Sequence, residues 1–270
     1  MTNTNISSGV TGSAQMQGAL WSARARDYAE LQEPHFLPLY KSVQRRPELA
    51  NSRSSLDVGC GPGLAVQVFS RTIANVAGID ASAGFIDIAR ERLPGRNLRV
   101  GEMETLEHAD RSFDLVTGFN AFQYAASPVN ALREARRVTL PDGAVVIATW
   151  GPPEHCDAAG HLKALGALMP PQPAGAPGPF ALSDESTLKA LVSEAGLTPI
   201  EVVDVDCPWI YQNLDIALRA MLSAGPAERA IRNAGVERAR DAVANSIAPY
   251  LKPSGEYHLS NKFRYLIARA

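Results

Sequence analysis

The chain has 270 residues, of which 46% are hydrophobic, so it can fill the core of one large α/β domain or of two small domains. Its 26 Lys and Arg residues against 28 Asp and Glu residues give a formal net charge of -2, which excludes a basic field able to hold a nucleic-acid backbone. No stretch reaches about 18 consecutive apolar residues, so a membrane span is excluded as well. We therefore expect a cytoplasmic protein, and its three scattered cysteines predict reduced thiols and no metal site.

The amino-terminal part divides into a polar stretch and an aromatic one. Residues 1–15 are small and polar, without the basic segment and apolar run of a signal peptide, and predict a disordered tail. Residues 16–48 follow as a helical segment. Within WSARARDY, Trp21, Arg24 and Tyr28 stand at positions i, i+3 and i+7, so one helical face is expected to carry all three.

From about residue 54 to 150, apolar strand patterns alternate with amphipathic helix patterns. This alternation predicts a parallel sheet with helices on both faces. The expected strands are 54–59, 75–80, 98–102, 113–119 and 144–150. The expected helices between them are 64–74, 82–93 and 130–139, and the turn LPDG (140–143) leads into the fifth strand.

The rest of the chain predicts a proline-rich connection and two more strands. Residues 151–182 are expected to form a mobile connection with a short helix inside, and Ser183 to cap the helix that follows and ends at Gly196. The expected sixth and seventh strands are 199–210 and 255–270, and 211–253 between them predict a helical cap insertion. The expected fold is a seven-stranded, mostly parallel Rossmann-like sheet that makes up a main domain at 49–270.

The loop after the first strand, LDVGCGPG (56–63), is the strongest local motif. A dinucleotide loop would place glycine where Leu64 stands, Pro62 removes one N–H group, and no GK[ST] of a Walker loop follows. Asp57 would repel phosphate and suits a cationic ligand, while Asp80 at the end of the second strand is placed to bind ribose hydroxyls. Both acids are also common as plain caps of turns and helices. As ligand-binding residues, they describe a nucleoside with a positively charged, amino-acid-bearing tail.

Four stretches in order carry a family resemblance: LDVGCGPG, GIDAS, GEMETLEHADRSFDLVTGFNAFQYAASP and ALREARRVTLPDG. Together they resemble the class I S-adenosylmethionine-dependent methyltransferases, in the small-molecule subgroup that includes the ubiquinone/menaquinone-biosynthesis type. The resemblance covers roughly residues 20–150. It implies methyl transfer from S-adenosylmethionine to an O, N, S or C atom of a small or medium organic metabolite, with S-adenosylhomocysteine as product, by a monomer or homodimer. A catalytically silent S-adenosylmethionine-binding protein and, less favoured, a nicotinamide-dependent oxidoreductase are the alternatives.

The resemblance also implies roles for particular residues. The glycine loop would surround the methionine moiety, Asp80 would bind the ribose, Glu102 would receive the adenine amino group where the family more often has Asp, and Asn120 would meet the ligand's amino group. In relatives an N-terminal helix closes over the cofactor, so residues 16–48 are expected to act as a lid in which Arg24 pairs with the cofactor carboxylate. The expected cofactor-binding residues are Trp21, Arg24, Tyr28, Asp57, Gly59, Cys60, Gly61, Asp80, Ala81, Glu102, Met103 and Asn120.

No strong base is obligatory for this chemistry, because the sulfonium methyl group is already activated and alignment supplies much of the rate. The candidate catalytic residues are His155, Tyr124 and Gln123, the last two on the methyl-transfer side. His161 also lies in the proline-rich connection, but a lone histidine is more often structural or exposed. Trp209 is a candidate for an acceptor pocket, although apolar packing explains it equally well.

Overall fold

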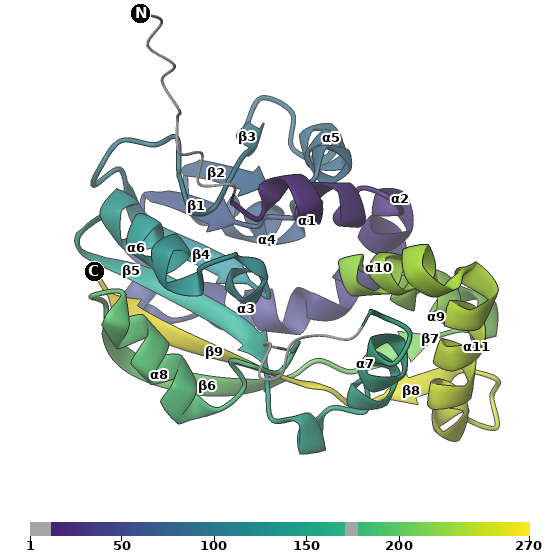
Figure 1. The fold of residues 1–270 in the computed structure, drawn as a ribbon. Helices are drawn as coiled ribbons and strands as arrows, with labels where there is room; N and C mark the ends of the chain where they lie inside the picture. The colour runs from purple at the N-terminus through teal and green to yellow at the C-terminus, as the bar shows by residue number, and fades with distance from the viewer. Residues whose placement is uncertain (1–11, 171–177) are drawn as a thin grey trace, which may run out of the picture.

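The computed structural model of the protein describes residues 12–170 and 178–270, which form a seven-stranded sheet flanked by helices (Figure 1). The strand order is β3-β2-β1-β4-β5-β9-β6. Strand β9 runs in the direction opposite to that of the other six strands. The expected Rossmann-like, mostly parallel sheet is therefore confirmed. Its strands are β1 (Ser54–Val58), β2 (Asn75–Asp80), β3 (Asn97–Val100), β4 (Phe113–Phe119), β5 (Thr139–Trp150), β6 (Thr198–Asp206) and β9 (Lys262–Arg269).

Helices cover both faces of the sheet because successive strand residues point to opposite sides. On β5, Val146 packs with the core under α3 (Leu37–Gln44), α4 (Leu64–Phe69) and α5 (Ala83–Arg92). Its neighbours Val145 and Ile147 pack with α6 (Pro128–Val138) and α8 (Glu185–Glu194). The apolar positions of α6 recur at helical spacing, at Ala131, Leu132, Ala135 and Val138, so a single face of this helix is buried.

The sixth and seventh strands are shorter than expected, because each expected strand is interrupted and forms two separate strands. The first break follows β6 at Cys207 and Pro208, where proline has no N–H group for the ladder, and β7 (Trp209–Tyr211) comes after it. The second break falls at Ser260 and Asn261, between β8 (Tyr257–Leu259) and β9. Strands β7 and β8 pair with each other as a separate two-stranded sheet.

Other boundaries also differ from expectation: the helix expected at 64–74 ends at Phe69, and two further differences concern β5 and α8. Strand β5 begins at Thr139 and includes the LPDG stretch predicted as a turn, which is accommodated by a register irregularity against β4 and a left-handed Asp142 at φ 63°. The cap of α8 is Asp184 rather than Ser183, because Asp184 accepts a hydrogen bond from the Thr187 N–H at 2.8 Å. The Ser183 hydroxyl instead donates to the carbonyl of Phe180.

Between β7 and β8 lie three helices, as expected for the helical insertion. They are α9 (Leu214–Met221), α10 (Gly225–Ala234) and α11 (Val236–Ile247), and α7 (Ala159–Gly166) packs against α11. Helices α9, α10 and α11 are here called the cap. Figure 1 shows them together with β7 and β8 at one end of the large sheet. In the described part of the chain, no helix combines the length and apolarity that crossing a membrane requires.

The N-terminal segment lies against the cap through a contact between α1 (Ala14–Trp21) and α10. Helix α1 includes Ala14 and Gln15, which are predicted to be in the tail. Gly12 and Ser13 precede the helix, and residues 1–11 of the predicted tail lie outside the described residues. The helix does not continue through Arg24, whose backbone leaves the helical region at φ -133° and ψ 43° before α2 (Ala25–Asp27). Short turns of 3₁₀ or π helix are η1 (Tyr28–Gln32), η2 (Glu33–Phe36), η3 (Pro47–Leu49), η4 (Phe122–Tyr124), η5 (Pro153–His155) and η6 (Ala248–Tyr250).

Candidate functional site

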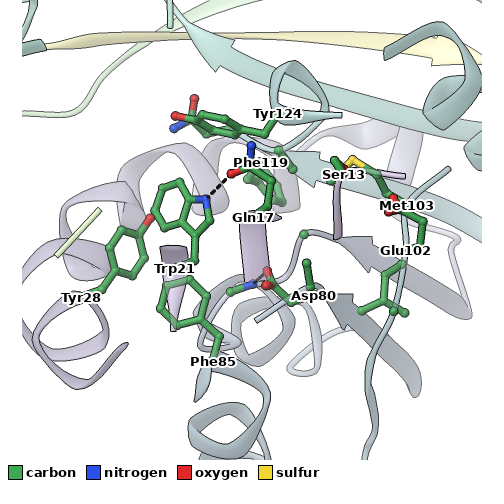
Figure 2. A pocket seen from close by; sticks show the side chains of 17 residues that line it. Ser13, Gln17, Trp21, Tyr28, Asp80, Phe85, Glu102, Met103, Phe119 and Tyr124 are labelled. Carbon is green, nitrogen blue, oxygen red and sulfur yellow. Dashed lines mark hydrogen bonds between the residues drawn. The ribbon is translucent and has the colours of Figure 1, made fainter. Parts of the chain in front are cut away.

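A cavity opens at the carboxyl ends of β1, β2 and β4 (Figure 2). The glycine loop after β1, the end of β2, the segment after β3 and the turn after β4 form its walls, and α1 covers it. Ligands of open α/β sheets bind at this edge, beside the point where the strand order reverses. Here that point lies between β1 and β4.

The glycine loop turns through left-handed backbone conformations, with φ of 72° at Gly59 and 53° at Gly61. A Cβ atom at Gly59 would lie 2.5 Å from the Cβ of Ala121, so a side chain is excluded there on space as well as on backbone geometry. Bare backbone at these two positions forms part of the cavity wall. The sequence therefore needs glycine at both positions to let a ligand approach the sheet edge.

The N–H groups of this loop are already used inside the protein. Gly59 and Cys60 both donate to the carbonyl of Ile79, Gly61 donates to Asp80 at 2.9 Å, and Gly63 donates to the carbonyl of Cys60. Pro62 has no N–H group to offer. The N–H of Leu64, the first residue of α4, donates to Glu33 at 3.0 Å. A protein carboxylate thus occupies the helix N-terminus where a phosphate would bind in a dinucleotide site.

Three carboxyl groups surround the loop, of which Asp57 and Glu33 are buried and Asp80 is half-buried. Asp80 lines the cavity and accepts hydrogen bonds from the N–H groups of Gly61 and Ser82, and burial raises its pKa to about 6. Asp57 lies beneath the loop, where Thr117 donates to it at 2.6 Å, and burial raises its pKa to about 7. Burial likewise raises the pKa of Glu33 to about 7, although Arg92 binds it at 2.6 Å. Burial disfavours the ionised forms of these acids, and a positively charged ligand nearby would stabilise them.

Glu102 and Met103 lie on the cavity wall after β3. Glu102 accepts a hydrogen bond from the N–H of Ala14 at 2.7 Å and another from the N–H of Glu104 at 3.1 Å. A Cβ atom at Gly12 would lie 2.2 Å from the Glu102 carboxylate. The first residues of α1 are therefore held directly over this end of the cavity.

Trp21 is the centre of an aromatic group on the other side of the cavity (Figure 2). Its ring centroid lies 5.5 Å from that of Tyr28, 5.5 Å from that of Tyr124 and 6.0 Å from that of Phe85. The indole N–H donates to Gln17 at 3.3 Å, one helical turn earlier. This hydrogen bond and the edge-to-face ring contacts fix the orientation of Trp21.

A second cavity lies on the far side of this aromatic group. Trp21, Tyr28, Asn120 and Tyr124 line both cavities, and they form the boundary between them. The other walls of the second cavity come from β5, α7, β7 and the α9–α10 region of the cap. Asn120 has a left-handed backbone, φ 54°, an unfavourable conformation of the kind that concentrates at functional sites.

The structure brings most of the expected site residues together. Those that line the first cavity are Trp21, Tyr28, Gly59, Gly61, Asp80, Ala81, Glu102, Met103, Asn120 and Tyr124. They come from five separate parts of the chain, and the sheet edge assembles them.

Five expected residues line neither cavity. Arg24 forms an ion pair with Glu228 of the cap, Asp57 is buried beneath the loop, and Cys60 packs against Gly78, where a Cβ atom would lie 2.8 Å from its sulfur. Gln123 donates a hydrogen bond to Asn120, and His155 is exposed on η5. Arg24 thus connects the N-terminal segment to the cap, and Cys60 packs against β2. Gln123 is hydrogen-bonded to Asn120, which lines both cavities.

Some residues of the site were not anticipated. Gln17 and Phe85 line the first cavity, and the spacing of Gln17, four residues before Trp21, was a usable helical signal. No sequence pattern pointed to Glu33, because its partner Leu64 is distant in the chain. The contact forms only when η2 packs against the start of α4. In the second cavity, His161 is a lining residue whereas His155 is not.

Comparison with known proteins gives a family match over the central part of the chain. Residues 56–147 match the family model of a methyltransferase domain. A malonyl-acyl-carrier-protein O-methyltransferase of Halorhodospira halophila is 37% identical over 111 residues, which cover 39% of this chain and 38% of that protein. A demethylmenaquinone methyltransferase of Renibacterium salmoninarum is 33% identical over 98 residues, 36% of this chain and 41% of that protein. This chain thus spans less than half the length of these relatives.

A likeness to solved structures extends over more of the chain. The YcgJ protein of Bacillus subtilis superimposes with a TM-score of 0.54 over 88% of this chain and 98% of that one, at 21% identity. At this identity the likeness shows the fold and no more.

Proposed function

Residues 56–147 of this chain belong to the class I S-adenosylmethionine-dependent methyltransferase family, and from this premise we propose that the protein transfers a methyl group from S-adenosylmethionine to a small or medium organic metabolite. The first cavity would hold the methyl donor and the second the acceptor. The observation that carries the proposal is the first cavity itself, which is lined by the carboxyl groups of Asp80 and Glu102 and by a loop whose N–H groups are already used. This combination suits a cationic nucleoside and disfavours a pyrophosphate.

The residues present fit such a donor. Asp80 would hold the ribose hydroxyls, because each of its oxygens accepts one backbone N–H group and has a further lone pair. Glu102 and Met103 would flank the adenine under the start of α1. When bound, S-adenosylmethionine supplies a methyl group activated by its sulfonium. Trp21 and Tyr124 would exclude water at the boundary and align the acceptor, a contribution on the order of 7–11 kcal/mol for well-oriented reactants.

The second cavity supports an enzyme over a silent binding protein. It adjoins the first across a boundary of only four side chains, as methyl transfer between two bound molecules requires. The nicotinamide alternative is disfavoured by Glu33, whose carboxylate occupies the N-terminus of α4. A pyrophosphate there would meet a buried acid instead of free N–H groups.

Calorimetric titration with S-adenosylhomocysteine, S-adenosylmethionine and NAD tests the proposal. We expect micromolar binding of both adenosyl compounds, no binding of NAD, and at least a tenfold loss of affinity in Asp80→Asn, about 1.4 kcal/mol. The matched control is Asp114→Asn, since Asp114 also accepts backbone hydrogen bonds, from Arg53 and Ser54, but lies outside the first cavity. Binding of NAD in place of the adenosyl compounds, or equal effects of the two substitutions, would contradict the proposal.

A further inference from the structure

We propose that the second cavity binds a neutral, planar ring compound, whose hydroxyl group donates a hydrogen bond to Nδ1 of His161 while a neighbouring oxygen of the same ring accepts one from Nε1 of Trp209. The inference rests on the proposed function, because it takes the occupant of this cavity to be the methyl acceptor. It adds the chemical class of that acceptor and the atom that receives the methyl group, an oxygen.

The walls of the second cavity define a neutral, aromatic environment. The chain has three tryptophans, Trp21, Trp150 and Trp209, and all three line this cavity. Among its lining residues in the described part of the chain there is no Asp, Glu, Lys or Arg. A charged acceptor would lose its hydration here without gaining an opposite charge, whereas a flat neutral ring can stack against the indole rings.

Two residues that line this cavity each carry a polar side-chain atom without a hydrogen-bond partner. Nδ1 of His161 and Nε1 of Trp209 are buried, and no group in the described residues bonds to either. The side chains are 4% and 3% exposed, and their ring centroids lie 6.0 Å apart. Because buried polar groups are normally paired, two such atoms on neighbouring rings of one cavity point to a ligand that completes them. The indole N–H can only donate, so its partner must be an acceptor such as an oxygen.

An unpaired histidine nitrogen does not by itself mark a site. Both ring nitrogens of His108 are also unpaired, yet His108 packs against Phe113 and lines neither of the two cavities. What distinguishes His161 is its place in a cavity that adjoins the proposed donor site. Burial lowers the pKa of His161 to about 4, so the ring is neutral at pH 7 and carries a free lone pair.

With Nδ1 as the nitrogen that carries this lone pair, His161 can accept the hydroxyl proton during transfer. The acceptor's O–H bond breaks and an O–C bond forms, the electron pair of the donor's S–C bond stays on sulfur, and the proton remains on the imidazole until product leaves. Charge is conserved, because the positive charge of the sulfonium reappears on the imidazolium. Release of that proton to solvent returns His161 to its neutral form.

The test is calorimetric titration of 2,3-dihydroxynaphthalene into the protein, with and without S-adenosylhomocysteine. We expect this neutral diol to bind, while 2,3-dimethoxynaphthalene, which has no hydroxyl proton to donate, and the anion 2-naphthoate bind at least about tenfold more weakly. His161→Phe should weaken diol binding about tenfold, and His161→Gln, which keeps a hydrogen-bond acceptor, should restore it while methyl transfer to the diol stays slow. Replacing the exposed His155 by Asn is the control, and it should change neither quantity.

The outcomes separate this inference from the proposed function. If S-adenosylhomocysteine binds the wild-type protein but the diol does not, or if the diol binds His161→Phe as tightly as wild type, the acceptor class is wrong and the donor site stands. Tighter binding of 2-naphthoate than of the diol would also overturn the neutral cavity. If the adenosyl ligand fails to bind, the proposed function fails, and the titration without it still decides whether the cavity takes the diol through His161.

Discussion

At the scale of single residues, the site is dominated by acids that folding places where their charge is unfavourable. Asp57 and Glu33 have pKa values of about 7 and Asp80 of about 6, in each case chiefly because they are buried. In the unfolded chain such groups ionise near pH 4. The folded protein therefore holds protons between pH 4 and 7 that the unfolded chain has released, and its stability falls as pH rises through this window.

This loss of stability with rising pH gives a prediction for the ligand-free protein between pH 6 and 7, inside the window. The free energy of unfolding should fall by on the order of 1 kcal/mol for each acid that titrates near 7. Asp57→Asn should reduce the fall, because the neutral amide keeps an oxygen for the Thr117 hydroxyl and no longer ionises. Urea denaturation at several pH values measures it, with Asp114→Asn as the control. A stability that rises with pH in this interval, or an unchanged slope in Asp57→Asn, would contradict the assignment of buried charge.

The residue scale also shows what a sequence can reveal. Gly59, Gly61 and Asp80 were predictable, because the loop and the strand end beside it are local patterns with a known geometric purpose. Arg24 was expected to face the cofactor, but the break in the helix turns it to Glu228. Contacts between distant segments depend on how elements pack, and periodicity within one segment carries no information about them.

At the scale of elements, α1 depends on a very close approach to the sheet edge. A Cβ atom at Gly18 would lie 2.3 Å from the carbonyl oxygen of Ala81, which lines the first cavity. Such a distance cannot be relieved by a flexible side chain, because the opposing atom belongs to the backbone. Gly18 therefore sets how tightly α1 closes the cavity.

Gly18→Ala should force α1 away from β2 and weaken S-adenosylhomocysteine binding by about 1–3 kcal/mol, the usual cost of overpacking. The matched control is Gly166→Ala in α7, where a Cβ atom meets nothing within 4 Å and the change should be neutral or slightly stabilising. Titration calorimetry and thermal unfolding of both variants distinguish the two effects. Wild-type affinity in Gly18→Ala would show that α1 does not close the donor cavity.

The elements of the sheet were more predictable than their ends. Strands β2 and β4 lie at the expected residues, because both are mostly apolar segments bounded by polar turns. The break of the sixth strand followed from Pro208, a signal present in the sequence, whereas the break at Asn261 depends on a hydrogen bond that its side chain accepts from the Ala158 N–H. A strand's length is thus decided partly by segments that reach it from elsewhere.

At the scale of the whole molecule, the N-terminal segment lines both cavities, and the cap lines the second cavity and packs against that segment. The N-terminal segment and the cap thus form two layers in contact. Glu228 of α10 binds Arg24 and Arg232, Arg232 donates to the carbonyl of Ala19, and Arg219 of α9 binds Asp27 at 2.6 Å. A Cβ atom at Gly225 would lie 2.6 Å from the indole nitrogen of Trp21. Because Trp21 lines both cavities, the layers cannot part without opening the two sites together.

Glu228 is the residue on which this closure depends most, since it lies between two arginines and is only 9% exposed. Glu228→Gln leaves those two positive charges facing each other, and we expect S-adenosylhomocysteine to dissociate about tenfold faster, because release requires the layers to separate. Stopped-flow displacement measures the rate, and Glu237→Gln, at an exposed acid of α11, is the control. High salt should speed release from wild type more than from the variant, since the variant has already lost the ion pairs. Equal rates in wild type and Glu228→Gln would mean that the donor leaves by a route that does not pass between these layers.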